Sequence, residues 1–323
     1  MKILVVCPAE EFASGNFCTK AFEALGHKTL IFDLEQKESS GGILSSRKKR
    51  LNAGLIDAVS EFRPDLLFVT KGLGILPETV SAIRKEGVVT VNWFPDDPHA
   101  FEESKKIAPF YDFYFTNDSA LIPDYREAGQ KNIHFLPFCC DPLVHKKVQL
   151  PEEEKKKYGA EISFVGQWNK PRQKLLETLA DFDLKVFGPG WGKRVKKGSP
   201  LYGKVFDPVY VAEVAKVYSA SAVVLNIHLW FGSFTHGVNV CLFEAAGCAA
   251  CQVCDFQEQI PELFLPEKEV VIFRSESELV QLVKRLTADK EKVSEIGANA
   301  QVRAYRDHTY EKRMREVLDI CGG

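Results

Sequence analysis

The chain has 323 residues, of which 45% are hydrophobic and 27% are charged, and this composition is typical of globular proteins long enough for two domains. Its formal net charge of −2 argues against a general nucleic-acid binder, which needs a basic surplus to contact phosphates. The first apolar run, residues 3–7, is far shorter than a membrane span or the core of a signal peptide, so we expect a cytoplasmic protein. The nine cysteines fall mostly in apolar runs, which favours free thiols over disulfides.

The first half of the chain alternates apolar runs with helical patterns. Unbroken apolar runs of this length are typical of buried parallel strands, and the intervening segments have helical periodicity. We therefore predict an open, mostly parallel sheet covered by helices. The expected strands are 2–7, 29–32, 66–70, 88–93, 111–116 and 132–137, and the expected helices are 17–25, 51–62 and 77–86.

The periodicity lapses between Pro142 and Pro151, and a charged helical turn follows at 152–157. A second alternating set then begins, so we place the domain boundary here. Its expected strands are 161–166, 184–188, 222–228, 249–254 and 270–273, its expected helices are 172–179 and 210–218, and a helical tail covers 293–321. The predicted domains are 1–145, 146–303 and a C-terminal helix at 304–323.

Residues 236–255 form the most informative stretch, in which a Gly-containing loop precedes a short helix and an apolar strand. Cap-type residues, including Asn239, predict a helix from about Gly237 to Gly247. Free amides at a helix start suit a diphosphate, and Glu244 lies where its carboxylate can accept hydrogen bonds from a ribose. A helix that only packs on a sheet, with Glu244 solvated, is the alternative.

Several stretches in the second half together resemble the CgeB/YkvP spore-maturation glycosyltransferase-like proteins, which are group-1 retaining glycosyltransferases of GT-B fold. The resemblance covers about residues 160–318, and it extends more loosely to residues 92–98 and 136–142. The stretches that carry it are ISFVGQWNKPR at 162–172, VFGPGW at 186–191, VYSASAVVLNIH at 217–228, residues 239–255 and HTY at 308–310.

The resemblance implies two doubly wound Rossmann-like domains that face each other across a cleft, with the C-terminal helix crossing back onto the first. It implies a nucleotide-diphosphate-sugar donor held by the second domain and an acceptor, of unknown identity, held by the first. Arg172 would stabilise the departing diphosphate and Lys170 would assist as a point charge. The other donor-binding residues that it implies are Gly15, Gly166, Gly188, Trp191, Val205, Gly237, Val238, Asn239 and Glu244.

Two positions depart from the family pattern. Many retaining relatives carry two glutamates eight positions apart, but His236 stands eight positions before Glu244. Cys241 stands where CgeB-like chains often have arginine. His236 therefore bears on both the identity of the sugar and the presence of activity.

The segment after the predicted strand 88–93 supplies the catalytic residues that we expect from the first domain, Asp97 and His99. Relatives present a histidine or an acid to the sugar from this region, although Asn92 lies nearer to the usual histidine position. The sequence Pro-Asp-Asp-Pro is also simply a good turn.

Other motifs are weaker. Cys248, Cys251 and Cys254 have spacing that mimics part of a metal-ligand run, but they lie in an apolar strand and we expect them to pack. Two basic clusters could touch anionic lipid weakly, although solvated surface is the simpler interpretation. The clusters are Arg47-Lys48-Lys49-Arg50 and the set Lys193, Arg194, Lys196 and Lys197.

The sequence thus predicts a retaining glycosyltransferase of hexosyl type without a cofactor. We expect no obligatory metal, because we recognise no Asp-x-Asp pair in the sugar-nucleotide domain and Asp96-Asp97 lies in the other domain. Two alternatives stay open. One is a non-catalytic nucleotide-sugar or carbohydrate-binding protein, and the other is a sugar-nucleotide epimerase or inverting transferase of the same fold.

Overall fold

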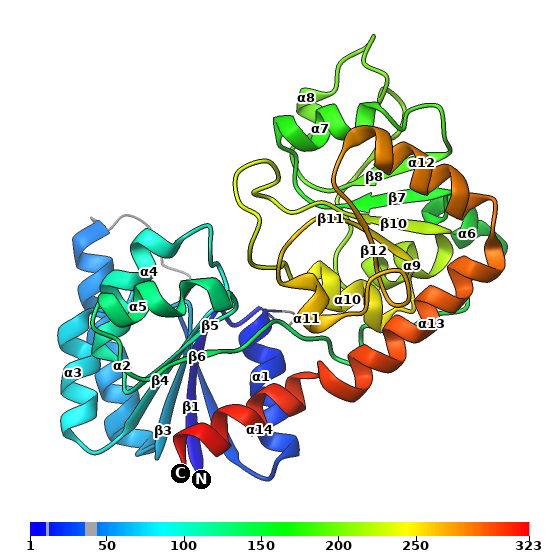
Figure 1. Cartoon of the computed structure of the whole chain (residues 1–323). Coiled ribbons are helices and arrows are strands. Elements are labelled where there is room, and N and C mark those ends of the chain that lie inside the picture. Colours follow the sequence, from blue (N-terminus) through cyan, green and yellow to red (C-terminus); the bar gives the residue numbers. More distant parts are fainter. Residues whose placement is uncertain (11–12, 36–43, 323) are drawn as a thin grey trace. The chain divides into compact units, whose positions relative to one another are not determined.

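The computed structural model describes residues 1–10, 13–35 and 44–322 (Figure 1). The chain divides into two units, of which unit 1 comprises Met1–Pro137 and Tyr310–Gly323 and unit 2 comprises Phe138–Thr309. The sequence pattern placed the corresponding divisions at 145/146 and 303/304. Each unit is built around its own parallel six-stranded sheet.

The sheet of unit 1 has the order β2-β1-β3-β4-β5-β6, and every neighbouring pair is parallel. The strands β1 and β3 are buried because nearly all of their side chains are apolar on both faces, as the unbroken runs predict. The strands are β1 (Lys2–Cys7), β2 (Lys28–Asp33), β3 (Leu66–Thr70), β4 (Val89–Phe94), β5 (Phe113–Thr116) and β6 (Ile133–Phe135).

Helices cover this sheet, and the C-terminal helix α14 packs against α1. The Phe17 and Tyr310 rings stack at 5.0 Å between these two helices. The tail of the chain is therefore part of the core of unit 1. The helices are α1 (Ser14–Ala24), α2 (Leu44–Phe62), α3 (Pro77–Lys85), α4 (Phe101–Ile107), α5 (Ile122–Glu127) and α14 (Tyr310–Cys321).

The sheet of unit 2 has the order β12-β11-β10-β7-β8-β9, again parallel throughout. Counted within the unit, this is the doubly wound order 3-2-1-4-5-6, whose direction of winding reverses between β7 and β10. Ligands of such sheets bind beyond the carboxyl ends of the strands at that switch point. The strands are β7 (Ile162–Val165), β8 (Leu184–Phe187), β9 (Val205–Phe206), β10 (Val223–Asn226), β11 (Gln252–Asp255) and β12 (Val271–Phe273).

The helices of unit 2 begin at recognisable caps. The side chains of Asn169, Ser275 and Asp289 accept hydrogen bonds from the first turns of α7, α12 and α13. These bonds satisfy amides that the helices themselves leave unpaired. The helices are α6 (Glu152–Tyr158), α7 (Lys170–Glu177), α8 (Trp191–Arg194), α9 (Ala212–Ala220), α10 (Cys241–Gly247), α11 (Ile260–Leu263), α12 (Glu276–Thr287) and α13 (Lys290–Asp307).

The structure differs from the predicted elements in several places. The helix expected from Gly237 begins only at Cys241. The short strand β9 and the helices α4, α5, α8, α11 and α12 were not predicted. The helical tail is interrupted at His308 and Thr309, where the His308 carbonyl accepts the Cys140 amide.

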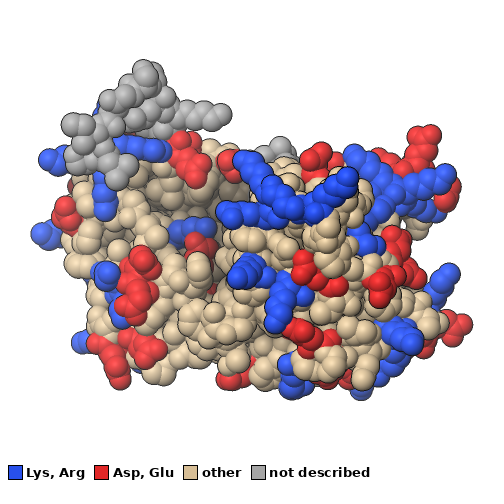
Figure 2. Space-filling model, turned by 90° about the horizontal axis from the view of Figure 1, so that it is seen from above, with Lys and Arg blue, Asp and Glu red and all other residues tan. Residues whose placement is uncertain are grey.

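Within the described part of the chain, no helix is long and apolar enough to cross a membrane. Figure 2 shows basic and acidic side chains interspersed over the face that is seen, with uncharged surface between them. This distribution agrees with a net charge close to zero.

Candidate functional site

Arg172 lies at the switch point of unit 2, in the first turn of α7 after β7. Its side chain is 6% exposed. The Asn169 side chain caps this turn by accepting the Arg172 amide at 2.8 Å, and it also donates to the Leu229 carbonyl at 2.9 Å. Asn169 thus fixes both the start of α7 and the segment that follows β10.

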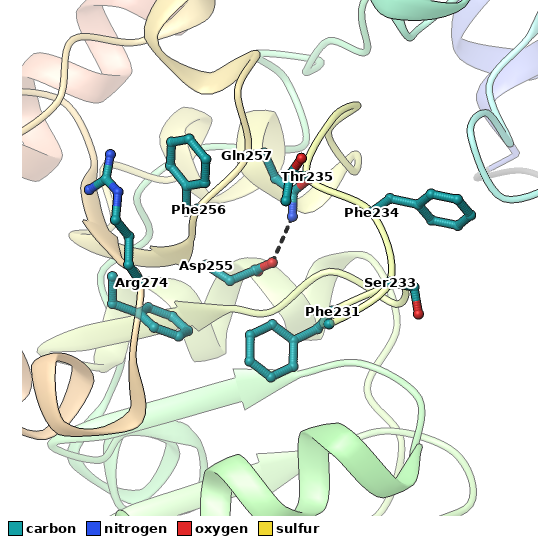
Figure 3. Close-up of a pocket in the computed structure, with 10 residues that line it drawn as sticks. Phe231, Ser233, Phe234, Thr235, Asp255, Phe256, Gln257 and Arg274 are labelled. Carbon is teal, nitrogen blue, oxygen red and sulfur yellow. Dashed lines mark hydrogen bonds between the residues drawn. The ribbon is translucent and has the colours of Figure 1, made fainter.

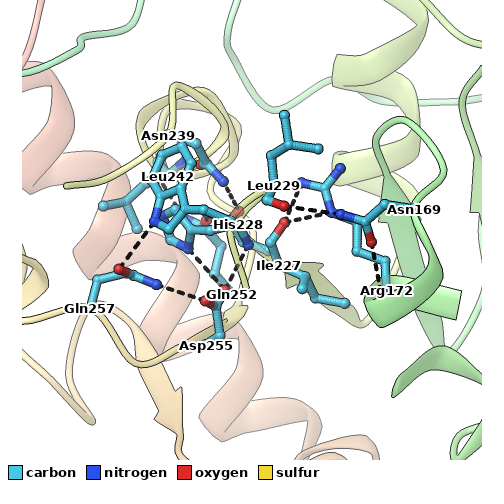
Figure 4. A network of polar contacts seen from close by, with 12 residues as sticks. Asn169, Arg172, Ile227, His228, Leu229, Asn239, Leu242, Gln252, Asp255 and Gln257 are labelled. Atoms are coloured by element: carbon cyan, nitrogen blue, oxygen red, sulfur yellow. Dashed lines mark hydrogen bonds and ion pairs between the residues drawn. The ribbon is translucent and has the colours of Figure 1, made fainter. Parts of the chain in front are cut away.

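The Arg172 guanidinium bonds to backbone carbonyls on both sides of the switch point, and Figure 4 shows it beside Ile227. Its Nε and Nη2 donate to the Ile227 oxygen at 3.1 and 2.5 Å, and its Nη1 donates to the Gln167 oxygen at 2.9 Å. A guanidinium has five N–H donors, so these three bonds leave two N–H groups without a partner among the described residues.

The charge of Arg172 is not neutralised by an ion pair with any described carboxylate. Burial lowers the pKa of the guanidinium, although the nearby Cys241 and Asp255 side chains oppose this shift. Burying a cation without a counter-ion is costly. The arrangement therefore suits an anion that arrives with a ligand.

The loop before α10 is held by a chain of amide side chains (Figure 4). Asn239 donates to the Asn226 oxygen at 2.7 Å and accepts the Leu242 amide at 3.2 Å. Gln252 accepts from Asn226 and donates to the Leu242 carbonyl at 2.8 Å. Asn239 was predicted to contact the nucleotide-sugar donor directly. In the structure, both the oxygen and the nitrogen of its side-chain amide make these internal bonds.

The start of α10 differs from the expected anion site. The amides of Leu242, Phe243 and Glu244 all donate to the turn formed by Asn239 and Val240. Val238 is buried in the loop before the helix, and Gly237 is also buried, with a φ of 75° that favours glycine. Any phosphate contact here would come from amides before Leu242 rather than from a free helix end.

Glu244 is only 24% exposed at its side chain, and its Oε1 lies 3.5 Å from the Nε2 of buried His145. The Nδ1 of His145 accepts the Asp141 amide at 2.9 Å, which places the ring proton of the neutral form on Nε2, facing Glu244. His145 therefore orients the Glu244 carboxylate, which stays partly accessible to solvent.

A hollow of about 440 Å³ lies at the carboxyl ends of β8 and β9, and it includes two predicted donor residues, Gly188 and Val205. Gly188 has a φ of 142°, and a Cβ placed there would lie 2.1 Å from the Gly166 oxygen. Only glycine fits, because the loops after β7 and β8 touch at this point. Gly190, Gly192, Lys193, Phe206, Asp207 and Pro208 complete the lining.

Trp191 and Gly166 act in packing. The Trp191 side chain is completely buried and donates from Nε1 to the Gly166 oxygen at 2.8 Å, so its ring faces the core rather than a nucleobase. The Gly166 position already abuts the Phe164 ring, because an added Cβ would lie 2.9 Å from that ring.

Two predicted residues lie at the surface of unit 2. Lys170 is exposed at the start of α7. His236 is half-buried, and its ring packs edge-on against the Phe234 ring, with the two ring centres 5.8 Å apart. Both side chains are accessible enough to meet a ligand.

Asp97 of unit 1 is not positioned to touch a substrate. It is completely buried after β4 and accepts hydrogen bonds from the hydroxyls of Thr116 at 2.6 Å, Tyr125 at 2.7 Å and Ser104 at 3.2 Å. Burial raises the pKa of this carboxyl to about 6, and the three hydroxyl donors oppose that shift. The geometry gives Asp97 a structural place and removes it from the catalytic residues that we consider.

The other predicted residues of unit 1 have varied surroundings. His99 is exposed, whereas Asn92 is completely buried and donates to the Lys71 oxygen at 3.1 Å. Gly15 lies in α1, and a Cβ there would lie 2.1 Å from the Cys7 Cβ, so this glycine lets the helix approach β1. Residues 11–12, which precede Gly15 in the chain, lie outside the described residues.

The cysteines pack as expected, and all nine are free thiols that lie among the described residues. Cys251 belongs to one apolar cluster of unit 2 and Cys248 to another. Burial raises the pKa of Cys251 to about 12. In the described ranges, no group of three or more His, Cys, Asp or Glu side chains could hold a metal ion.

One Asp-x-Asp sequence, Asp181-Phe182-Asp183, went unrecognised in the sequence interpretation. It precedes β8, at the amino ends of the strands, and the Asp183 amide donates to Glu161 at 3.0 Å. The pair therefore lies at the edge of the sheet opposite to Arg172.

Sequence reasoning also missed a buried polar network at the ends of β10 and β11. Asp255 accepts the backbone amide of His228 at 2.8 Å, its Oδ1 lies 2.8 Å from the His228 Nδ1, and its Oδ2 accepts from Gln257 at 2.8 Å (Figure 4). The His228 Nε2 is buried without a hydrogen-bond partner. Polar residues directly after two adjacent apolar strands were the signal in the sequence.

Solved structures similar to this chain share one architecture. They include sucrose-phosphate synthase from Thermosynechococcus elongatus (TM-score 0.71, 14% identity, 99% of this chain and 98% of that chain covered). A glycosyltransferase from Rickettsia africae has a TM-score of 0.69 at 14% identity, covering 99% and 97%. Anabaena HepE in complex with UDP-glucose has a TM-score of 0.66 at 14% identity, covering 99% of each chain. Together with the two parallel sheets, these similarities show that the fold is GT-B.

A narrower similarity comes from the sequence. Residues 171–319 match a family model described as glycosyl transferase-like. Most of this segment lies in unit 2 and includes Arg172, Glu244 and the hollow beside Gly188. No curated protein sequence matches the chain significantly. The chain is thus a GT-B protein with a glycosyl transferase-like segment.

Proposed function

We propose that this protein is a retaining glycosyltransferase of the CgeB/YkvP type that uses a nucleotide-diphosphate-sugar donor. The observation that carries this proposal is the buried Arg172 guanidinium, which has no ion pair with a described carboxylate and lies at the switch point of unit 2. A diphosphate would supply the missing negative charge. UDP-sugars are the first donors to test, because HepE was solved with UDP-glucose.

The surrounding features support individual roles. The hollow lined by Gly188 and Val205 is large enough for a nucleobase at one side of Arg172. Glu244 would accept hydrogen bonds from the ribose hydroxyls, and its orientation by His145 limits the entropy lost on binding. Lys170 would add a mobile positive charge near the phosphates.

In the proposed reaction, the bond between the anomeric carbon and the diphosphate oxygen breaks while the acceptor hydroxyl attacks from the same face. The hydroxyl proton leaves with the diphosphate. Arg172 stabilises the charge that develops on the leaving group. We propose that transfer needs no metal ion, that it takes place in the cytoplasm, and that His99 and His236 approach the sugar.

His236 favours a second function. It stands where many retaining relatives carry a glutamate, so a nucleotide-sugar-binding protein without transferase activity is the alternative. An epimerase or an inverting transferase of the same fold is a further alternative. These possibilities differ in whether the donor is cleaved and in the configuration of the product.

A donor panel separates them. Thermal shifts with UDP-, GDP-, dTDP- and ADP-sugars identify the nucleotide, and donor hydrolysis with and without EDTA measures turnover. Arg172→Ala and Glu244→Ala are the site variants, and proton NMR of the released sugar reports its anomeric configuration. We expect a shift with one nucleotide class, cleavage that withstands EDTA, and retention.

The outcomes divide the hypotheses. If no nucleotide raises the melting temperature, the donor-site proposal is wrong. If a donor binds but is neither hydrolysed nor transferred, the binding-protein alternative is favoured. An inverted product or an epimerised donor points to the remaining alternative.

A further inference from the structure

A second hollow, of about 410 Å³, lies in unit 2 at the carboxyl ends of β11 and β12 and along the segment after β10. It is formed by different residues from the hollow beside Gly188. Its lining consists of Phe231, Gly232, Ser233, Phe234, Thr235, Asp255, Phe256, Gln257, Phe273 and Arg274 (Figure 3).

Arg274 provides the charge of this hollow. Its guanidinium carbon lies 4.4 Å from the centre of the Phe256 ring, and Figure 3 shows the two side chains beside each other. No described carboxylate forms an ion pair with this guanidinium. A planar cation held over a ring keeps its N–H edge available for a carboxylate or a phosphate.

Aromatic rings form the apolar part of the hollow. Phe231 and Phe273 lie with their ring centres 6.3 Å apart, and the half-buried rings of Phe231 and Phe256 line the hollow itself. Figure 3 shows that Phe234 points away from the other rings. Rings of this kind offer flat surfaces to the C–H face of a sugar.

The polar groups at the base of the hollow are held in fixed positions. Gln257 donates to Asp255, and its oxygen accepts the Trp230 Nε1 at 3.3 Å. Asp255 is in turn held by the backbone and ring of His228. The Gln257 amide keeps one N–H without a partner among the described residues. Because the orientation of the amide is set, this N–H can select a hydroxyl at a defined position.

We propose that this hollow is a binding site for an anionic sugar, one that carries a carboxylate or a phosphate group. Arg274 binds the anion, the rings of Phe231 and Phe256 contact the sugar ring, and Gln257 and Thr235 bind hydroxyls. The site goes beyond the donor site of the proposed transferase, because it contains none of Arg172, Glu244 or Gly188.

Titration calorimetry on the full chain tests the proposal. The ligands are glucuronate, glucose 6-phosphate, neutral glucose and inorganic phosphate, and the variants are Arg274→Gln and Arg274→Lys. Arg194→Gln is the matched control, because Arg194 is also exposed and stacks on an aromatic ring, Trp168, at 4.7 Å but lies outside the hollow.

We expect saturable binding of at least one anionic sugar, at least 10-fold tighter than glucose or phosphate alone. Arg274→Gln should weaken it at least 10-fold, Arg274→Lys should be intermediate, and Arg194→Gln should bind like the wild type. A comparison of glucuronate with glucose 6-phosphate identifies the anion that is preferred.

Three results would overturn the proposal: no binding of either anionic sugar, equal weakening in Arg274→Gln and Arg194→Gln, or phosphate binding as tightly as the sugar phosphate. The thermal shift produced by the donor nucleotide is measured in parallel and should be unchanged in Arg274→Gln. Failure of this site is thereby distinguished from failure of the donor site.

Discussion

A buried ionisable side chain lies near the carboxyl edge of each sheet, but the two side chains differ in how completely their hydrogen bonds are satisfied. In unit 1, the carboxyl group of Asp97 is completely enclosed by three hydroxyl donors. In unit 2, the guanidinium of Arg172 is also buried, but it bonds only to backbone carbonyls and keeps two N–H groups without a partner among the described residues. A buried polar side chain whose hydrogen bonds are all made within the fold has a structural role, whereas a buried cation with unused N–H donors and no ion pair indicates a ligand.

The largest expected effect on nucleotide affinity comes from replacing Arg172. Arg172→Ala should lower the affinity for the donor nucleotide by about 100-fold, or about 2.7 kcal/mol, because the phosphates lose their charged contact. The measurement is titration calorimetry with UDP or the nucleotide found in the donor panel.

Arg313→Ala is the matched control for this change. Arg313 is a buried arginine of unit 1 that donates to the Pro137 carbonyl at 3.0 Å. Its loss should lower the melting temperature without changing nucleotide affinity. Equal affinities of the two variants would contradict the contrast between the units.

A glycine in each unit gives the next test. Gly188→Ala should weaken nucleotide binding about 30-fold, because the new Cβ would lie 2.1 Å from the Gly166 oxygen and force apart the loops beside the hollow. Gly15→Ala places its Cβ equally close to the Cys7 Cβ in unit 1.

Gly15→Ala should therefore destabilise the packing of α1 on β1 while nucleotide affinity stays within about 3-fold of the wild type. Hydrogen exchange of the α1 and β8 peptides shows which unit each substitution loosens. A loss of nucleotide affinity in Gly15→Ala as large as that in Gly188→Ala would extend the donor site to unit 1.

Glu244→Gln should have a smaller effect. The glutamine amide keeps the shape of the Glu244 side chain but accepts hydrogen bonds from the ribose less strongly. We therefore expect about 10-fold weaker nucleotide binding and little change in stability. Glu262→Gln, at an exposed acid of α11, is the control in the same calorimetric assay. Wild-type affinity in Glu244→Gln would leave this carboxylate without a role in binding.

Asp97→Asn should change stability rather than binding. The folded pKa of Asp97 is about 6, above its ordinary value of 3.8, so the folded state holds this proton more tightly than the unfolded state. The stability that this carboxyl contributes is therefore present below pH 4 and is lost as the pH rises to about 6.

Between pH 4 and 7, the free energy of unfolding of the wild type should thus fall by on the order of 2 kcal/mol relative to that of Asp97→Asn. Hydrogen exchange of the β4 and β5 peptides at several pH values measures this difference. A difference that does not vary with pH would show that the carboxyl has no raised pKa in the folded state.

The sequence predicted the sheets well because buried parallel strands need apolar side chains on both faces. The runs at 2–7 and 66–70 coincide with β1 and β3, for example. The two-residue strand β9 was missed because so short a pairing leaves no pattern. The helix at α10 begins later than its cap-type residues suggested, because Asn239 bonds within the loop and does not start the helix at Gly237.

The site was only partly predictable, because residue type does not reveal which polar groups are already satisfied. Arg172 and Glu244 lie at the carboxyl edge of unit 2, as their positions after β7 and in α10 suggested. Trp191 and Asp97 were predicted to act on a ligand, but both side chains are completely buried. Asp255 is the last residue of β11 and Arg274 directly follows β12, yet nothing in the sequence alone joins them in one hollow.

The central claim is that unit 2 binds a nucleotide-diphosphate sugar around Arg172. Hydrogen exchange of the full chain, with and without a saturating donor nucleotide, tests it most directly. The account predicts slower exchange in peptides that cover residues 166–173 and 237–247. Protection confined to unit 1, or no protection with any nucleotide of the panel, would contradict it.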